Sequence, residues 1–254
     1  MTRPARQPEA VLTRFASTAR THTGGRRLNE DRVLERPDIG LWAVADGMGG
    51  HMAGDVASNM VVEALGRVAR FASGYAYLND VAAQLQAVNR EMLDGAGGGP
   101  GRPGLMGSTV VALLAHEGYY ACVWAGDSRA YLLRRGRLLR ITHDHSLVQE
   151  LVDSGALTAD QARSHPRANV ITRAVGVAHP LVLEKRHAPI EPGDIFLLCS
   201  DGLTGTMQDE EIEERLRRGD LANAADDLLG LALGRGARDN VSLVLVAAES
   251  VAST

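Results

Sequence analysis

Cysteine is scarce in this chain of 254 residues: only Cys122 and Cys199 occur, and both lie inside apolar runs. Two thiols exclude the disulfide framework typical of small secreted proteins. A zinc site would need more cysteines or histidines at ligand spacing than this sequence offers. We therefore expect two buried thiols in a reducing compartment.

Long apolar runs and an excess of basic residues are missing as well. The longest apolar stretch, around residues 108–114, is far too short to cross a bilayer. The polar segment Met1–Arg14 lacks the apolar core of a signal peptide. With 27 Lys and Arg against 31 Asp and Glu, the formal net charge is −4, which gives no reason to expect nucleic-acid binding. We expect a cytoplasmic protein that contacts no membrane and no nucleic acid.

Four short aspartate motifs are what the sequence does have. They are Asn29-Glu30-Asp31, Asp46-Gly47-Met48-Gly49-Gly50-His51, Ser200-Asp201-Gly202 and Asp239-Asn240. Three of them adjoin apolar runs that are typical of buried strands. A carboxylate is costly to bury alone, and several brought together repel one another unless a cation lies between them. The pattern predicts a metal site assembled from distant parts of the chain.

Aspartates without histidines at ligand spacing favour a hard cation, because Mg²⁺ and Mn²⁺ prefer oxygen ligands. Glycine follows both Asp46 and Asp201, so we expect a sharp backbone turn that exposes the Gly47 carbonyl as a further ligand. Two ions roughly 3.5–4 Å apart could share one carboxylate and hold a water that attacks a phosphate ester. A lone Asp-Gly pair is usually only a turn, so the specificity lies in the ordered set.

Hydrophobic periodicity predicts strands in the centre of the chain and pairs of helices before and after them. Four runs between residues 108 and 142, separated by glycine-containing turns, indicate an antiparallel meander. The expected strands are 11–19, 31–35, 41–45, 108–115, 119–125, 129–133, 137–142, 181–188, 195–200 and 242–248, and the expected helices are 55–71, 79–93, 146–154, 158–164, 209–218 and 221–233. Sheets need cover on their outer faces, so we expect an α+β fold in which helices pack outside a β-sandwich.

Two irregular segments stand out. Residues 94–107 are rich in glycine but lack the Gly-Lys-Ser/Thr ending of a phosphate-binding P-loop, so we interpret them as a flexible surface loop. Residues 144–175 form a long excursion between the central strands and the next one. Excursions of this length from a compact core are often functional.

Taken in order, these motifs resemble the bacterial PP2C-type (PPM) serine/threonine protein phosphatases over about residues 13–248. The matching segments are Arg26 with Asn29-Glu30-Asp31, Asp46 to His51, Gly107-Ser108-Thr109, Gly126-Asp127-Ser128-Arg129, residues 169–176, Ser200-Asp201-Gly202 and Asp239-Asn240. The resemblance implies an αββα sandwich, with two antiparallel sheets flanked by helix pairs and a two-metal cleft at one end.

The resemblance also implies a role for each site residue. Asp46 would bridge two Mn²⁺ or Mg²⁺ ions, the Gly47 carbonyl would complete the second, and Asp201 and Asp239 would ligate the first. Glu30 and Asp31 would hold metal-bound waters. Asp127, with Asp201, would bind a third, weaker ion. Arg26 would grip the substrate phosphate, since guanidinium and phosphate match as a two-pronged pair. Residues 144–175 would be a flap beside the cleft.

One position departs from the animal enzymes of this family, which carry a histidine thought to act as general acid directly after the Asp-Gly pair. Here that position is Met48, as is usual in bacterial members, and methionine cannot donate a proton. His51 is a weak alternative donor that we otherwise expect to orient the loop. The remaining histidines show no metal spacing, and we expect them on the surface or in loops.

The implied reaction is hydrolysis of phosphoserine or phosphothreonine in proteins, opposite a cognate serine/threonine kinase. Residues 1–12 would be an N-terminal extension and residues 13–250 a monomeric catalytic domain. A scaffold without catalysis should have lost a ligand carboxylate, and none is lost. A two-metal phosphodiesterase or nuclease would carry aspartate–histidine ligand pairs, which the sequence lacks.

Overall fold

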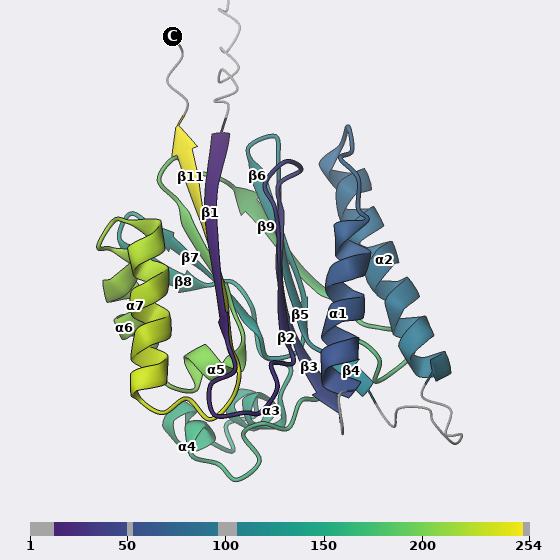
Figure 1. Ribbon diagram of the computed structural model, residues 1–254, viewed down its shortest axis with the longest axis vertical. Helices are drawn as coiled ribbons and strands as arrows, with labels where there is room; N and C mark the ends of the chain where they lie inside the picture. Colours follow the sequence, from purple (N-terminus) through teal and green to yellow (C-terminus); the bar gives the residue numbers. More distant parts are fainter. Residues whose placement is uncertain (1–12, 50–52, 96–105, 251–254) are drawn as a thin grey trace, which may run out of the picture.

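Two antiparallel β-sheets lie face to face between two layers of helices in the computed structural model (Figure 1), which describes residues 13–49, 53–95 and 106–250. One sheet has the strand order β1-β11-β10-β7-β8, and the other has the order β2-β3-β5-β6-β9 with β4 paired to β3. The first sheet contains β1 (Thr13–His22), β11 (Val241–Ser250), β10 (Ile195–Cys199), β7 (Arg129–Arg134) and β8 (Arg137–Arg140). The second contains β2 (Asp31–Arg36), β3 (Leu41–Gly49), β4 (Met106–Ser108), β5 (Val110–His116), β6 (Tyr119–Ala125) and β9 (Glu184–Pro189).

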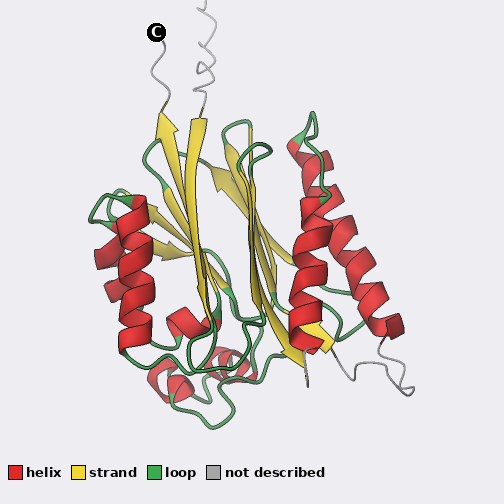
Figure 2. Cartoon of the chain, viewed as in Figure 1, coloured by secondary structure: helices red, strands yellow, loops and turns green. Residues whose placement is uncertain are grey.

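The helices cover the outer faces of the sheets, as Figure 2 shows. α1 (Ala53–Gly66) and α2 (Gly74–Gly95) pack against the β2–β9 sheet, and α6 (Asp209–Leu216) and α7 (Leu221–Gly234) pack against the β1–β8 sheet. Three short helices, α3 (Leu147–Asp153), α4 (Ala159–Arg163) and α5 (Asp201–Thr204), lie at the end of the sandwich opposite the start of β1 and the end of β11. The expected αββα sandwich is confirmed.

Alternation of side chains along the strands builds the core in three layers. In β3, Leu41, Ala43 and Ala45 face α1 and α2, while Trp42 and Val44 face the other sheet. Because successive residues of a strand point to opposite faces, a continuous apolar run can be buried on both sides. Between the sheets, the rings of Tyr120 and Phe196 meet edge-to-face with centroids 5.0 Å apart. Cys122 and Cys199 are free and fully buried, as expected.

The expected four-stranded meander is wrong. β5 pairs with β6 in one sheet and β7 pairs with β8 in the other, while β6 and β7 do not pair. The segment Gly126-Asp127-Ser128 carries the chain from one sheet to the other instead of closing a hairpin. The sequence shows turn residues in both cases, so local turn chemistry could not separate a hairpin from a crossing between sheets. The crossing is what brings Asp127 to the end of the sandwich.

Several element ends differ from the expected ones, and at α2 the reason is a capping residue. α2 begins at Gly74 because Ser73 caps it: the Ser73 hydroxyl accepts a hydrogen bond from the Ala76 N–H at 3.2 Å. α1 ends at Gly66 and not at residue 71, although Val68 still packs into the core. The predicted strand 181–188 starts only at Glu184. α3 and α4 match their predictions, and Thr158 forms a capping box with Gln161 at the start of α4.

Some expectations fall on residues outside the described ranges, namely the N-terminal extension 1–12, most of the glycine-rich loop, and His51. Within residues 13–49, 53–95 and 106–250, no helix is both long and apolar enough to span a membrane.

Candidate metal centre

Acidic residues from both sheets meet at the end of the sandwich where α3, α4 and α5 lie, at the bottom of Figure 1. Asp31 begins β2, and Asp46 lies near the end of β3. Asp201 follows β10, and Asp239 precedes β11. Asp127 follows β6 in the segment that crosses between the sheets. Antiparallel pairing places these strand ends at the same end of the sandwich. It thereby brings together residues up to 208 positions apart in the sequence.

Asp31 and Asp46 face each other directly, because they are register partners in the β2–β3 pair. The Asp31 carboxylate accepts a hydrogen bond from the Ser200 hydroxyl at 2.8 Å, which links the two sheets. The backbone of Asp46 is held by Thr109, whose hydroxyl accepts from the Asp46 N–H at 3.0 Å and whose own N–H donates to the Asp46 carbonyl at 2.8 Å. The Asp31 carboxylate and the Asp46 backbone are therefore held in place by these contacts.

The sharp turn expected at Gly47 is absent, because Gly47 continues β3 and pairs with Ser108 of β4. Glycine is needed there for close packing: a Cβ on Gly47 would lie 1.9 Å from the Gly54 carbonyl oxygen of α1. Gly202 likewise lies in the first turn of α5 and makes no sharp turn. The sharp turns expected at the Asp-Gly pairs were therefore wrong, and the Gly47 carbonyl as a metal ligand stays a prediction. At Gly47, glycine lets the start of α1 approach the acidic end of β3.

Three carboxylate oxygens are buried here without a hydrogen-bond partner: one each from Asp31, Asp127 and Asp201. Buried polar atoms in folded proteins are nearly always satisfied, so each exception points to a missing ligand, ion or water. Anionic oxygens without partners fit a hard divalent cation. This observation supports a metal at the site more directly than the sequence motifs do.

Burial and mutual repulsion raise the pKa values of this group. Burial first, and then the charges of the nearby Asp127, Asp239 and Asp31, raise the pKa of Asp201 to about 8. Burial also raises the pKa values of Asp31 and Asp127 to about 6 each. The pKa of Asp46 lies well above its ordinary value because of burial, with Asp31 the leading charged neighbour. Cations at this site would remove the repulsion and restore the ionised forms.

The carboxylates do not yet surround a common point. Among the described residues, no three acidic, histidine or cysteine side chains are close enough together to hold an ion as they stand. Asp239 is ion-paired with Arg26, with 2.7 Å between Oδ2 and Nη2, and Asp31 is bonded to Ser200. These neighbours hold the Asp239 and Asp31 carboxylates apart from a closed ligand set, whereas three buried oxygens have no partner and remain free to bind a cation.

Arg26 and Glu30 line the open side of the centre on the loop between β1 and β2. The Arg26 side chain is 55% exposed, so it can leave Asp239 for an incoming anion. Glu30 is half-buried, and burial, followed by Asp239 and Asp55, raises its pKa although Arg26 lowers it. A hollow of about 470 Å³, lined by residues that include His22, Gly24 and Arg238, adjoins this loop. It lies beside the carboxylates and is not centred on them.

Two residues that shape this end were quoted in the motifs but were given no role. Asn240 is buried and holds the β1–β2 loop: its side chain accepts from the Glu30 N–H at 2.8 Å and donates to the Thr23 and Leu28 carbonyls at 2.9 Å. Thr109 fixes Asp46 and is bonded to the Ser128 hydroxyl at 2.7 Å. Asn240 directly follows Asp239 and Thr109 belongs to the Gly107-Ser108-Thr109 motif, and these positions were the available signal.

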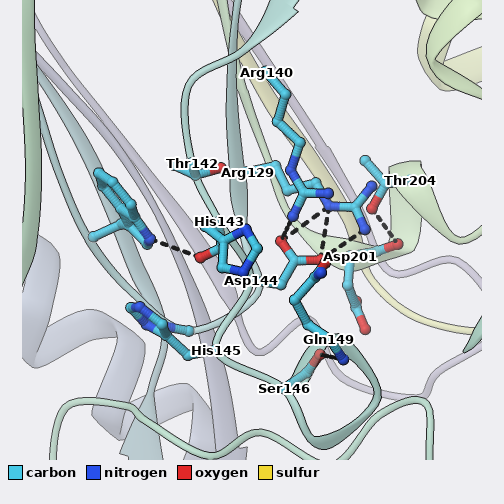
Figure 3. Close-up of polar contacts among 12 residues, drawn as sticks. Arg129, Arg140, Thr142, His143, Asp144, His145, Ser146, Gln149, Asp201 and Thr204 are labelled. Carbon is cyan, nitrogen blue, oxygen red and sulfur yellow. Dashed lines mark hydrogen bonds and ion pairs between the residues drawn. The ribbon is translucent and has the colours of Figure 1, made fainter. Parts of the chain in front are cut away.

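The flap segment, residues 144–175, is anchored beside the centre by ion pairs. Figure 3 shows the guanidinium groups of Arg129 and Arg140 directed at the carboxylate of Asp144. Arg129 donates two hydrogen bonds to Asp144, at 2.7 Å from Nη2 and 3.1 Å from Nε, and Arg140 makes a further ion pair. Because Asp144 and Arg129 are both largely buried, this pairing fixes the start of the flap to β7.

The unassigned histidines were expected on the surface or in loops, and His145 does lie in a loop, but it is buried. Its side chain is only 5% exposed and is stacked on the Trp124 ring at an interplanar angle of 11°. His143, two residues earlier, fits the expectation: it is half-exposed, and its ring bonds only to Asp153, at 2.7 Å. Met48 lies in β3 and is part-buried, and its thioether has no proton to donate.

Comparison with known proteins gives concordant matches. Residues 19–232 match the family model described as protein phosphatase 2C. The chain is 40% identical over 217 residues to the serine/threonine protein phosphatase PstP of Mycobacterium tuberculosis, covering 85% of this chain and 41% of that protein. The chain thus spans less than half the length of this relative.

Solved structures resemble the whole described domain. A structure of PppA, titled as a key regulatory component of T6SS in Pseudomonas aeruginosa, has a TM-score of 0.85 at 43% identity and covers 92% of this chain and 97% of that one. The catalytic domain of a PstP in complex with two manganese ions has a TM-score of 0.81 at 36% identity, covering 93% and 99% of the two chains.

Proposed function

The chain belongs to the protein phosphatase 2C family of metal-dependent serine/threonine phosphatases, and we propose that it hydrolyses phosphoserine and phosphothreonine in proteins with a metal-activated water. The observation that carries this proposal is the set of buried carboxylates with unpaired oxygens at the end of the sandwich. A phosphate dianion would be repelled by such a set alone. It can approach only if cations outweigh the carboxylate charge.

The residues present fit two divalent ions. Asp46 would lie between both, with the Gly47 carbonyl as a ligand of the second and Asp201 and Asp239 as ligands of the first. The family structure with two manganese ions supports Mn²⁺ as one choice, and the all-oxygen donor set suits Mg²⁺ equally. Asp127 and Asp201 would share a third, weaker ion, since each has a buried oxygen without a partner.

When bound, the ions supply a nucleophile at neutral pH and neutralise charge on the phosphate. The chain's own groups orient the reactants. Arg26 would move from Asp239 to the substrate phosphate, and Glu30 and Asp31 would accept hydrogen bonds from water at the centre. Met48 gives the leaving oxygen no proton, so the proton would come from water at the site or from another group, or the oxygen would leave with the help of the metal.

Hydrolysis of a phosphothreonine peptide in Mn²⁺, measured as phosphate release, tests the activity. We expect turnover with the peptide, loss of turnover in excess chelator, and no cleavage of single-stranded DNA under the same conditions. Cleavage of DNA without release of phosphate from the peptide would contradict the proposal and favour a two-metal nuclease.

Replacing Arg26 with alanine tests the phosphate contact. We expect Arg26→Ala to raise KM for the phosphopeptide about tenfold and to lower kcat little, because the guanidinium would contact phosphate in the ground state and the transition state alike. Steady-state kinetics measure both constants. Arg20→Ala is a matched control, since Arg20 also pairs with an aspartate, Asp226, at 2.6 Å but lies away from the carboxylates. A loss confined to kcat would assign Arg26 a different role.

We further propose the physiological setting. Residues 13–250 form the catalytic domain, which acts as a cytoplasmic monomer on phosphoproteins made by a cognate serine/threonine kinase. The phosphatase family and the formal net charge of −4, which disfavours nucleic acid as a partner, support this setting. Co-purification of the chain with a kinase or its phosphorylated substrates, together with its mass in solution, would test it.

A further inference from the structure

His145 lies at a junction that the proposed function does not use. Its ring is buried between Trp124 and the segment that carries Asp127. Nδ1 accepts a hydrogen bond from the Gly126 N–H at 3.1 Å, and the His145 N–H donates to the Gly126 carbonyl at 3.0 Å. His145, a flap residue, thus bonds both the N–H and the carbonyl of Gly126, the residue directly before Asp127.

The hydrogen bonds fix the tautomer of His145. The Gly126 N–H can only donate, so Nδ1 must carry no proton, and a neutral ring then has its proton on Nε2. Nε2 lies 3.1 Å from Glu184 Oε1, to which it donates, and also 3.1 Å from Arg173 Nη1, which cannot accept a hydrogen bond and itself donates to the same carboxylate at 3.2 Å. Burial lowers the pKa of His145, which agrees with a neutral ring. The ring therefore has one defined orientation.

The opposite side of the Asp127 segment is held just as closely. A Cβ on Gly126, whose φ is +120°, would lie 2.6 Å from the Thr109 side chain. The Ser128 hydroxyl is bonded to Thr109, and Arg129 is bonded to Asp144. The consecutive flap residues Asp144 and His145 therefore hold Arg129 and Gly126, which lie after and before Asp127 in the chain. Asp127 has a buried oxygen without a partner.

His145 also joins the two ends of the flap. Its carbonyl accepts a hydrogen bond from the Thr172 N–H at 2.8 Å, and its ring meets Arg173 and Glu184 beyond the flap helices. A displacement of either end of the flap would therefore move His145, whose ring and backbone N–H are both bonded to Gly126. Among the described residues, the His145 side chain is the flap acceptor of the Gly126 N–H, and the Asp144 side chain accepts from Arg129 on the other side of Asp127.

We propose that His145 is a positioning residue that fixes the Asp127 carboxylate for the weaker metal ion and couples that site to the order of the flap. The inference rests on the proposed function, because it takes Asp127 as a metal ligand. It assigns His145 no contact with substrate or metal. His145 holds the Gly126–Asp127 backbone in one position. Its carbonyl and its ring also contact Thr172 and Arg173 at the other end of the flap.

Two substitutions separate the hydrogen bond from the packing. His145→Phe keeps a ring against Trp124 but leaves the buried Gly126 N–H without an acceptor, whereas His145→Asn keeps an acceptor near the Nδ1 position and loses the ring. We expect His145→Phe to weaken the weaker component of Mn²⁺ binding about tenfold in calorimetry and to speed amide exchange at Gly126 and Thr172. His145→Asn should restore most of the affinity.

The matched control is His143→Asn, two residues away on an exposed side chain, which should change neither readout. Asp127→Asn should abolish the weaker component, and if it does not, the proposed third site itself fails. If Asp127→Asn removes that component while His145→Phe leaves it intact, the role given to His145 is wrong, even where the melting temperature falls. Should His145→Phe not fold, Glu184→Ala, at a carboxylate 41% exposed, replaces it and should weaken binding in the same direction.

Discussion

Asp239→Asn is expected to lower kcat/KM for a phosphothreonine peptide about a thousandfold. The carboxylate would ligate the first ion, and a metal contributes several kcal/mol to the transition state, so losing its ligand removes a comparable amount. The fold should survive, because asparagine keeps the oxygen that accepts the Asn240 N–H at 2.9 Å. Asp46→Asn, at the carboxylate proposed to lie between both ions, should cost at least as much.

Asp226→Asn is the matched control for this experiment. Asp226, like Asp239, is paired with an arginine of the N-terminal part of the chain, but it lies on the exposed face of α7. Its loss should leave turnover unchanged. Kinetics would be measured together with bound metal, quantified after dialysis. Near-normal turnover of Asp239→Asn with full metal content would refute the proposed two-metal centre.

Sequence reasoning predicted the layers of this fold because each layer has a local signal. The strand–helix order and the apolar runs indicate two sheets covered by helices. The structure confirms this arrangement, with one five-stranded and one six-stranded sheet between helix pairs. The meander was wrong because pairing between β6 and β7 depends on which sheet each joins, and that is decided by long-range packing. Turn residues at Gly126 fit both outcomes.

The candidate site could be predicted as a set of residues but not as a set of contacts. The ordered motifs identify Asp46, Asp201 and Asp239, and the strands bring them to one end. No pattern indicates that Arg26 rests on Asp239, or that His145 is buried against Trp124. Such contacts join loops whose paths depend on the whole fold, and a lone histidine in a polar segment carries no periodic signal.

Stability should depend on pH in opposite ways with and without metal. Without metal, Asp31 and Asp127 have pKa values of about 6 and Asp201 of about 8 in the folded state, against an ordinary value of 3.8. Between pH 4 and pH 8 the folded state therefore keeps protons that the unfolded state releases. Lowering the pH favours the state that binds more protons, which here is the folded state. The melting temperature in chelator should therefore decrease as pH rises through this window.

Added Mn²⁺ should reverse that trend, because its ligands must be deprotonated and the ion displaces the retained protons. At one hundred times the dissociation constant, binding adds about 2.7 kcal/mol, which is roughly 5–10 °C in melting temperature for a domain of this size. The gain should be larger at pH 8 than at pH 5. Thermal melts at both pH values with Mn²⁺ or chelator would measure it, with Asp239→Asn as the variant expected to lose most of the gain. An equal gain at both pH values would mean that the ion binds away from the buried carboxylates, since only there does binding have to displace protons.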